Sequence, residues 1–368
     1  MTPNARPLAT ESDADGTLPR QDPVPVLEAR AMTVTFPSRS GPVAAVRGIS
    51  LTIHTGEIVG VVGESGSGKS TLALALQDLL RPPAEVHGDV RLAGGISLYT
   101  LPPRRRVALH GEKVGMVFQA SQSSMNPVLP ISVQAAHVAR SHGLPPSTGI
   151  RRLSELAARV GLDPDRTLSA YPHQLSGGQK QRTSLCLALI LNPPLVILDE
   201  PTTALDVLTQ EEVLDTLREV RRDLGTAFLF ITHDIGVVAS LADRLTVLYA
   251  GAIVEEGATQ DLLRDPRHPY TRALVTSMPR LDRSHLGVPI PGTPPDLSRL
   301  GPGCAFAPRC PLREAVCDTE TPRLLPFPGA ATPSGSDTAR TPSHRAACFV
   351  AARAAHEAMS KTGEGVIS

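Results

Sequence analysis

The sequence contains no tryptophan, few other aromatic residues and no excess of charge of either sign. Its 36 Lys and Arg residues are balanced by 36 Asp and Glu residues, so it lacks the basic footprint of a nucleic-acid-binding protein. We therefore expect no nucleic-acid partner. The remaining composition, 41% hydrophobic and 20% charged over 368 residues, is ordinary for a globular protein of two or three structural units.

Long hydrophobic runs are also missing. No stretch reaches the roughly 18 to 20 apolar residues that cross a bilayer. The most apolar region, residues 185–198, is interrupted by Asn192, Pro193 and Pro194. The first 30 residues carry charges and prolines but no apolar segment of a secretory signal. We expect a cytoplasmic protein that works at a membrane only through a partner.

Cysteine is scarce, with five residues and no CxxC pair. Cys186 lies alone in an apolar helical run and is predicted to be a small core residue. The other four are separated by 5, 6 and 30 residues, at Cys304, Cys310, Cys317 and Cys348. In a cytoplasmic protein such a cluster favours a metal site over disulfides, although a zinc ribbon is a weak match. An iron–sulfur cluster, zinc and unligated thiols all remain open.

The hydrophobic pattern predicts alternating strands and helices. Residues 1–26 lack periodicity and are expected to form a disordered tail. Residues 27–35 and 43–53 have the alternation of short strands, and the apolar run 58–62 is typical of a buried parallel strand. Residues 70–80 favour a helix that Pro82 and Pro83 would end.

The same alternation continues after a mostly helical insertion predicted at about 121–180. Strands are expected at 195–198, 227–231 and 245–249, and helices at 208–224 and 235–242. This order predicts an α/β fold with a parallel sheet. Proline then becomes dense from 279 to 342, and residues 329–343 are expected to form a flexible loop.

One glycine-rich motif predicts a phosphate-binding loop. It matches G-x-x-x-x-G-K-S/T between a predicted strand and helix, and it consists of Gly63, Glu64, Ser65, Gly66, Ser67, Gly68, Lys69 and Ser70, with Thr71 next. Glycines let the backbone N–H groups approach phosphates, and the helix N-terminus favours anions. Lys69 would reach the β- and γ-phosphates, and Ser70 would offer a hydroxyl to Mg²⁺.

A second motif places two carboxylates after the strand 195–198. Asp199 fits a Mg²⁺ ligand, and Glu200 fits a base or a water-orienting residue beside the γ-phosphate. The alternative is a strand followed by a charged helix cap. The phosphate loop makes the catalytic interpretation the stronger one.

The segment Leu175-Ser176-Gly177-Gly178-Gln179 resembles the signature motif of ATP-binding cassette (ABC) proteins. The resemblance extends to residues 27–350 and implies a P-loop NTPase core with antiparallel and helical subdomains. It implies a cassette at 27–258 and an extension at 259–368. Further matches are Phe36 for adenine stacking, Gln119 of the Q-loop, Ala204-Leu205-Asp206 of the D-loop and the switch histidine His233.

The resemblance implies ATP and Mg²⁺ as cofactors, with Ser70, Gln119 and Asp199 around the metal ion. Ser176, Gly178 and Asp206 would complete the ATP site of a second cassette, identical or distinct. Glu200 would position water, while Lys69, Gln119 and His233 stabilise the transferring phosphoryl group.

Several segments resemble the oligopeptide and dipeptide importers, whose nickel-importing relatives are close; they are residues 124–127, 171–174, 268–274, 291–297 and 303–311. Ala120 and Ser121 depart from the usual Asp-Pro, and the loop 329–343 is longer than usual. The resemblance implies a motor at the cytoplasmic face of the plasma membrane, two permease subunits, a solute-binding protein and a 4Fe–4S cluster on the four late cysteines. The alternatives are nickel or another small solute as cargo, or a cassette protein of DNA repair or translation.

Overall fold

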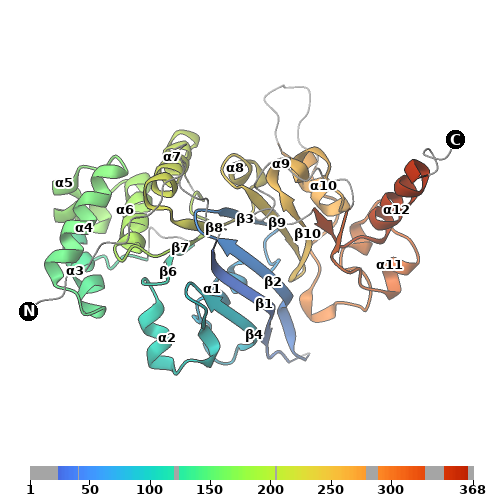
Figure 1. The fold of residues 1–368 in the computed structure, drawn as a ribbon, viewed down its shortest axis with the longest axis horizontal. Helices are drawn as coiled ribbons and strands as arrows, with labels where there is room; N and C mark the ends of the chain where they lie inside the picture. The colour runs from blue at the N-terminus through green and yellow to red at the C-terminus, as the bar shows by residue number, and fades with distance from the viewer. Residues whose placement is uncertain are drawn as a thin grey trace, which may run out of the picture.

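The computed structural model describes residues 24–39, 41–119, 124–203, 205–278, 289–327 and 344–363, without the side chains from residue 357 onward. Most of the predicted tail, Ala120, Ser121, Ala204 and the predicted loop 329–343 lie outside these residues. Figure 1 shows strands at the centre, the helices α3 to α6 at one end and the C-terminal helices α11 and α12 at the other.

The central sheet has eight strands in the order β11-β12-β10-β9-β3-β8-β7-β6. Its parallel part is formed by β6 (Val114–Val117), β7 (Leu195–Asp199), β8 (Ala227–Thr232), β3 (Ile58–Val62) and β9 (Arg244–Tyr249). This confirms the predicted parallel sheet. The antiparallel strands β10 (Ala252–Ala258), β12 (Arg345–Ala346) and β11 (Leu325–Pro326) extend it, so the C-terminal region shares the same sheet.

A second, antiparallel sheet of four strands has the order β2-β1-β4-β5. Its strands are β1 (Pro25–Phe36), β2 (Val43–His54), β4 (Glu85–Leu92) and β5 (Ile96–Ser97). The sequence predicts β1 and β2 but not β4. Only Val90 and Leu92 of β4 are buried, and Gly88 interrupts the strand at a φ of 113°, where an added Cβ would lie 2.7 Å from the Arg30 carbonyl oxygen. A glycine inside a strand usually indicates such a close backbone approach.

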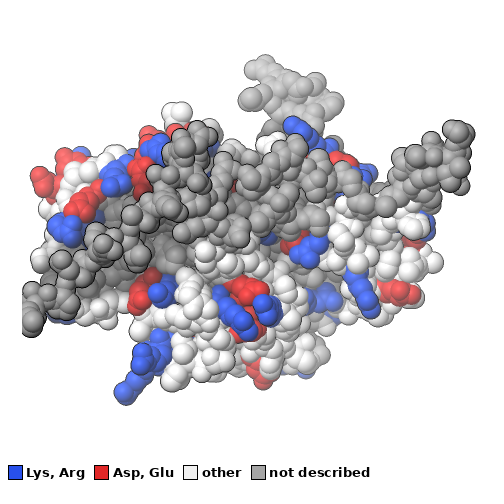
Figure 2. Space-filling view, viewed as in Figure 1, with Lys and Arg blue, Asp and Glu red and all other residues white. Residues whose placement is uncertain are grey.

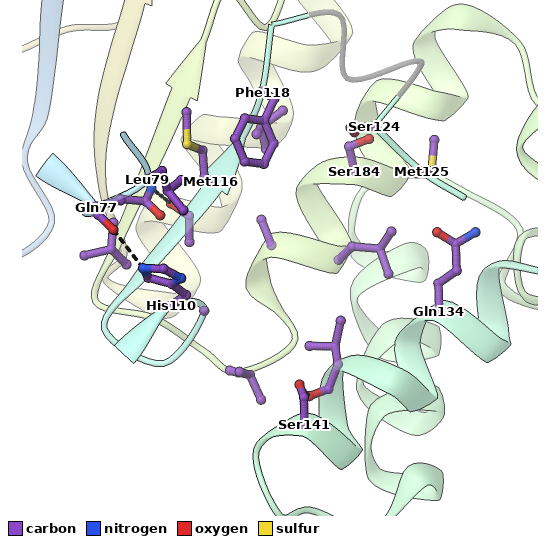
Figure 3. A pocket seen from close by; sticks show the side chains of 18 of the residues that line it. Gln77, Leu79, His110, Met116, Phe118, Ser124, Met125, Gln134, Ser141 and Ser184 are labelled. Atoms are coloured by element: carbon purple, nitrogen blue, oxygen red, sulfur yellow. Dashed lines mark hydrogen bonds between the residues drawn. The ribbon is translucent and has the colours of Figure 1, made fainter. Parts of the chain in front are cut away.

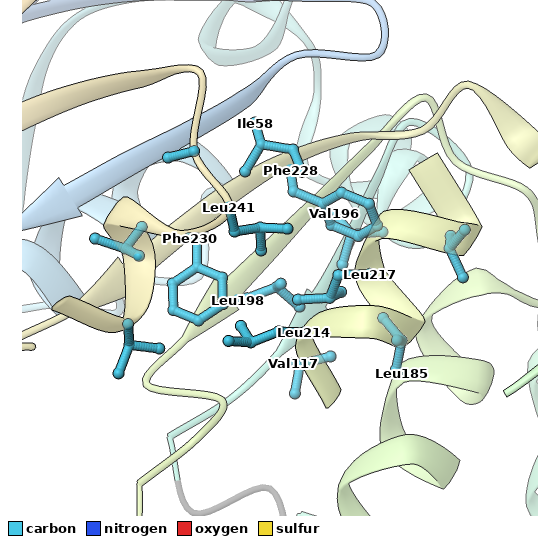
Figure 4. Close-up of a cluster of buried hydrophobic side chains, with 14 of the residues drawn as sticks. Ile58, Val117, Leu185, Val196, Leu198, Leu214, Leu217, Phe228, Phe230 and Leu241 are labelled. Carbon is cyan, nitrogen blue, oxygen red and sulfur yellow. The ribbon is translucent and has the colours of Figure 1, made fainter. Parts of the chain in front are cut away.

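Two apolar cores flank the parallel strands because both faces of these strands are buried. On β8, Phe228 and Phe230 face one core, whereas Leu229 and Ile231 face the other. Figure 4 shows the first core, where Phe228 and Phe230 lie with Leu214 and Leu217 of helix α7. The second core lies between the central sheet, helix α1 and the antiparallel sheet.

The helices largely follow the predicted positions. The insertion contains α3 (Ile131–Ser141), α4 (Pro146–Arg159), α5 (Pro164–Ser169) and the start of α6 (Gly177–Leu189), followed later by α7 (Val207–Leu224) and α8 (Ile235–Ala239). The C-terminal helices are α9 (Thr259–Arg264), α10 (Pro269–Thr276), α11 (Val316–Thr319) and α12 (Phe349–Gly363), and α2 (Pro103–Leu109) precedes β6. No helix within the described ranges is long and apolar enough to cross a bilayer.

Helix α1 (Lys69–Leu76) is shorter than predicted. The chain turns at Asp78, whose φ is 54°, and the Leu79 N–H donates to the Leu74 carbonyl oxygen at 2.9 Å. This left-handed cap ends the helix before the prolines do.

On the face in Figure 2, the visible basic and acidic side chains are interspersed.

Candidate nucleotide-binding site

The glycine-rich loop joins the carboxyl end of β3 to α1. Gly66 and Gly68 have φ angles of 78° and 97°, and Gly68 caps the helix. An added Cβ on Gly63 would lie 2.3 Å from the Leu248 carbonyl oxygen, and one on Gly68 would lie 2.2 Å from that of Ala45. These contacts explain why the loop needs glycines. It lies at the edge where parallel sheets bind ligands.

Lys69 lies across this loop with only 6% of its surface exposed. Its Nζ donates to the carbonyl oxygens of Gly63 at 2.7 Å and Glu64 at 2.9 Å. Burial lowers the pKa of Lys69, while the charges of Glu200, Asp199 and Glu64 act in the opposite direction. The acceptors of these hydrogen bonds are neutral oxygens, so an anionic ligand would be a stronger partner for the ammonium group.

Ser70 and Asp199 form a pair of oxygen donors next to Lys69. The Ser70 hydroxyl donates to Asp199 Oδ1 at 3.2 Å, and Asp199 is 4% exposed. Burial raises the pKa of Asp199, against the effects of the Ser70 hydrogen bond and the Lys69 charge. A cation would stabilise this buried carboxylate, and hydroxyl and carboxylate oxygens are ligands that Mg²⁺ accepts. The donor set therefore fits the expected metal ion.

Glu200 connects the remaining residues of the site. Its φ is 50°, and its N–H donates to the Ile231 carbonyl oxygen at 2.9 Å, which fixes the backbone beside β8. Gln119 Nε2 donates to Glu200 Oε2 at 3.3 Å, and His233 Nδ1 lies 3.3 Å from Oε1. Thr203 also donates its hydroxyl to Oε2 at 3.0 Å. The structure thus brings Gln119, Glu200 and His233 together, and it adds Thr203, which sequence reasoning missed.

The signature segment begins helix α6. Ser176 and Gln179 cap it reciprocally: Ser176 Oγ accepts the Gln179 N–H at 3.3 Å, and Gln179 Oε1 accepts the Ser176 N–H at 2.9 Å. Gly178 packs against α7, where an added Cβ would lie 2.4 Å from Thr209 Cγ2. Asp206 caps α7 by accepting the Thr209 N–H at 3.0 Å and its hydroxyl at 2.7 Å. Ser176, Gly178 and Asp206 therefore belong to one packed junction of α6 and α7.

For three further predicted positions in the described part of the chain, Phe36, Ser65 and Thr71, the structure shows the place but no contact with the residues around Glu200. Phe36 is at the end of β1, paired with Val43 and partly buried against the second core. Ser65 is exposed on the loop, and Thr71 lies in the first turn of α1. Their contact with a nucleotide stays a prediction.

The four late cysteines gather without forming a metal-binding group. Burial is the main cause that raises the pKa of Cys304 to about 11, and the thiols of Cys317, Cys348 and Cys310 also contribute. The Cys304 N–H donates to the Cys317 carbonyl oxygen at 2.8 Å. Yet no set of three or more His, Cys, Asp or Glu side chains in the described part of the chain is arranged to hold a metal ion. The thiols are close enough to influence one another, but their present arrangement does not fit a cluster.

A cavity of about 350 Å³ separates the central sheet from the helical insertion. Figure 3 shows Met116 and Phe118 on one side and Met125, Gln134 and Ser141 on the other. The Phe118 residue is 41% exposed. An exposed aromatic residue at the mouth of an apolar cavity is typical of a binding surface.

Family models match two parts of the chain. The ABC transporter model matches residues 46–203. A model described as the C-terminal region of oligopeptide/dipeptide transporters matches residues 254–317. The first contains the phosphate loop, the signature segment and both motif carboxylates, and the second contains Arg309 and three of the late cysteines.

Curated relatives are named as ATP-binding proteins of oligopeptide or dipeptide transport. The chain is 38% identical to the dipeptide transport ATP-binding protein DppD of Bacillus subtilis, over 91% of this chain and 98% of the relative. It is 38% identical to the oligopeptide transport ATP-binding protein OppD of Salmonella typhimurium, over 83% and 91%. It is 46% identical to OppD of Mycobacterium tuberculosis over 88% of this chain, but it spans only 52% of that relative's length.

Solved structures share the fold of the cassette. The chain is similar to a dimeric ABC transporter cassette, MJ0796, with 28% identity and a TM-score of 0.56, over 63% of this chain and 98% of that one. A structure of the same cassette in a post-hydrolysis state with ADP and phosphate gives 27% identity and a TM-score of 0.55, over 63% and 98%. The expected fold class is confirmed.

Proposed function

Because the chain belongs to the family of ATP-binding subunits of oligopeptide and dipeptide ABC transporters, we propose that it is the ATP-hydrolysing motor of a peptide importer. One observation carries this proposal: Gln119 and His233 both contact the carboxylate of Glu200, whose charge also acts on the buried Lys69. The cassette at 27–258 would supply the chemistry, and the extension at 259–368 would support it.

The residues of the site have separate roles in this proposal. Lys69 exchanges its carbonyl partners for the β- and γ-phosphates. Ser70 and Asp199, with Gln119, hold Mg²⁺, which when bound neutralises developing charge on the phosphate oxygens. Glu200 accepts a hydrogen bond from the attacking water and orients it in line with the γ-phosphate. His233, held at Glu200, stabilises the transferring group.

A second cassette, identical or distinct, would complete the site. Ser176 and Gly178 offer a hydroxyl and the N-terminal N–H groups of α6, which favour an anion. Beside Asp206, Val207 and Leu208 are 80% and 79% exposed. Exposed apolar residues next to a helix start are suited to burial in an interface. The similar MJ0796 cassette has a dimeric structure.

Two permease subunits would each place a helix in such a cavity, one between β6 and α3 of this chain (Figure 3) and one in the second cassette. Its apolar lining and the exposed Phe118 support a helix-in-groove contact. This arrangement puts the chain at the cytoplasmic face of the plasma membrane, with a solute-binding protein on the other side. Peptide is proposed as cargo from the names of the relatives, with nickel or another small solute as the alternative.

The 4Fe–4S cluster remains a proposal for the four late cysteines. Their mutual influence on pKa supports it, whereas no three of these side chains form a metal-binding group in the described part of the chain. Anaerobically purified protein with absorbance near 400 nm and bound iron would support the cluster. Colourless, iron-free protein from the same preparation would contradict it.

Co-purification from native membranes tests the transport proposal. The tagged full chain should recover two permeases and a peptide-binding protein, identified by mass. A Phe118→Asp variant, which charges the mouth of the cavity, should lose the permeases while still binding ATP. Recovery of DNA-repair or translation proteins in place of permeases would favour the alternative of a cassette outside transport.

A further inference from the structure

The C-terminal region reaches the phosphate loop through two contacts on Glu64. The hydroxyl of Tyr270, in the first turn of α10, accepts the Glu64 N–H at 2.8 Å, across 206 residues of sequence. Arg309 ends the short helix η5 (Ala307–Arg309) and pairs with the Glu64 carboxylate across 245 residues. Its Nη1 donates to Oε2 at 2.6 Å and its Nη2 donates to Oε1 at 2.9 Å. Both the backbone and the side chain of this loop residue are therefore held from outside the loop.

Arg309 is held in place by residues outside the phosphate loop, from both the C-terminal region and β9. Its side chain is 5% exposed, and its Nε donates to the Pro291 carbonyl oxygen at 2.8 Å. Its guanidinium carbon lies 5.9 Å from the ring centroids of both Tyr249 and Phe306. These rings also pack on Tyr270, with centroid separations of 4.6 and 5.4 Å. A bidentate pair presented from such a packed cluster imposes one geometry on Glu64.

The pairing also controls charge at the loop. Glu64 is one of the three carboxylates whose charges raise the pKa of Lys69 against the effect of burial. Lys69 nevertheless donates to carbonyl oxygens, while the Glu64 carboxylate pairs with Arg309. A Glu64 carboxylate without Arg309 would attract Lys69 and repel a polyphosphate. The adjacent Arg309 charge offsets both effects.

We propose that Arg309, assisted by Tyr270, is a positioning residue for ATP binding that acts through Glu64 and adapts the phosphate loop in shape and charge to a polyphosphate. The inference rests on the proposed ATPase function. It gives the C-terminal region a direct part in nucleotide affinity.

The affinity of the purified full chain for ATP with Mg²⁺, measured by titration calorimetry, tests this inference. Arg309→Met should weaken ATP binding about tenfold, the order expected for one uncompensated charge several ångströms from the phosphates. The loss should shrink in about 0.5 M salt, because the charge is then screened. In steady-state assays KM should rise while kcat changes less than about twofold.

The Glu64→Gln background separates positioning from a general structural role. Adding Arg309→Met to Glu64→Gln should weaken binding by no more than about threefold, because no Glu64 carboxylate is then left to be held in place and only the direct effect of the Arg309 charge is lost. Arg313→Met is the matched control. Arg313 also makes a bidentate pair, with Asp318 at 2.8 and 2.9 Å, but its side chain is 52% exposed and its partner lies outside the phosphate loop. If Arg309→Met does not fold, Arg309→Lys keeps the charge and should weaken binding about two- to fivefold, again only with Glu64 present.

The outcomes are distinct. An equal loss in both backgrounds, or no loss in Arg309→Met, would overturn the inference while wild-type binding upholds the proposed function. Wild-type protein that binds no ATP would instead refute the proposed function itself.

Discussion

His233 Nδ1 lies 3.3 Å from Glu200 Oε1, although 33 residues separate the two in sequence. Each follows the carboxyl end of a parallel strand, β8 for His233 and β7 for Glu200, and these strands are neighbours in the sheet. The contact therefore depends on the pairing of β7 with β8.

This contact predicts a turnover defect for His233→Ala. The side chain is 58% exposed, so its removal should leave the fold unchanged. Loss of a group that stabilises the transferring phosphoryl should lower kcat by about 10²-fold with little change in KM. Steady-state ATPase assays measure both constants. His173→Ala, which removes a histidine from the surface beside Tyr171, is the control and should keep its turnover.

Asp199→Asn should raise the Mg²⁺ concentration needed for ATP binding by at least about tenfold. The amide keeps the shape of the carboxylate but removes the charge that a cation would stabilise. Titration of Mg²⁺ at fixed ATP measures the shift. Asp215→Asn alters a carboxylate that is 63% exposed on α7 and should leave the titration unchanged. Equal Mg²⁺ dependence in both variants would contradict the assignment of Asp199.

Gly178→Ala should destabilise the junction of α6 and α7. Its Cβ would lie 2.4 Å from Thr209 Cγ2, so the helices must shift, at a cost of about 1–3 kcal/mol in the free energy of unfolding. Thr209→Ser removes that methyl group but keeps the hydroxyl that bonds to Asp206. Urea unfolding of the two single variants and the double variant should show recovery in the double variant. Additive losses would show that the clash is not the cause.

The positions of the site residues can be predicted from the sequence where they depend on a local pattern. The glycine loop and the two carboxylates each follow a buried parallel strand, and the carboxyl ends of such strands lie at one edge of the sheet. Lys69, Asp199 and Glu200 therefore lie close together, as predicted. The order of parallel strands then brings Gln119 and His233 to them.

Contacts between residues far apart in the chain, and elements with a weak pattern, could not be predicted from the sequence. Nothing near Arg309 indicates that its partner is Glu64, 245 residues away. In strand β4 only Val86, Val90 and Leu92 alternate with polar residues, and Gly88 breaks this short pattern. The left-handed turn at Asp78 has no glycine to indicate it.

Buried His268 predicts a dependence of stability on pH. Its Nδ1 accepts the Tyr270 N–H at 3.1 Å, and burial lowers its pKa from 6.5 to about 4 against the charge of Glu255. A lowered pKa means that the unfolded chain takes up the proton first. The contribution of His268 is therefore complete above about pH 6.5 and is lost as pH falls toward 4, by roughly 3 kcal/mol.

Chemical unfolding at several pH values measures this slope. His268→Asn keeps an acceptor at the start of α10 but does not titrate, so its free energy of unfolding should fall less steeply between pH 6.5 and 4. Parallel curves for the wild type and the variant would show that His268 does not carry the effect.

ATP binding and ATP hydrolysis by wild type and Glu200→Gln, measured side by side, test the central claim most directly. The amide keeps the size of the side chain and can still accept the Gln119 hydrogen bond, but it loses the charge that orients water. The account predicts similar ATP affinity and a loss of turnover of about 10²-fold or more. Wild-type turnover in Glu200→Gln would contradict the proposed catalytic site.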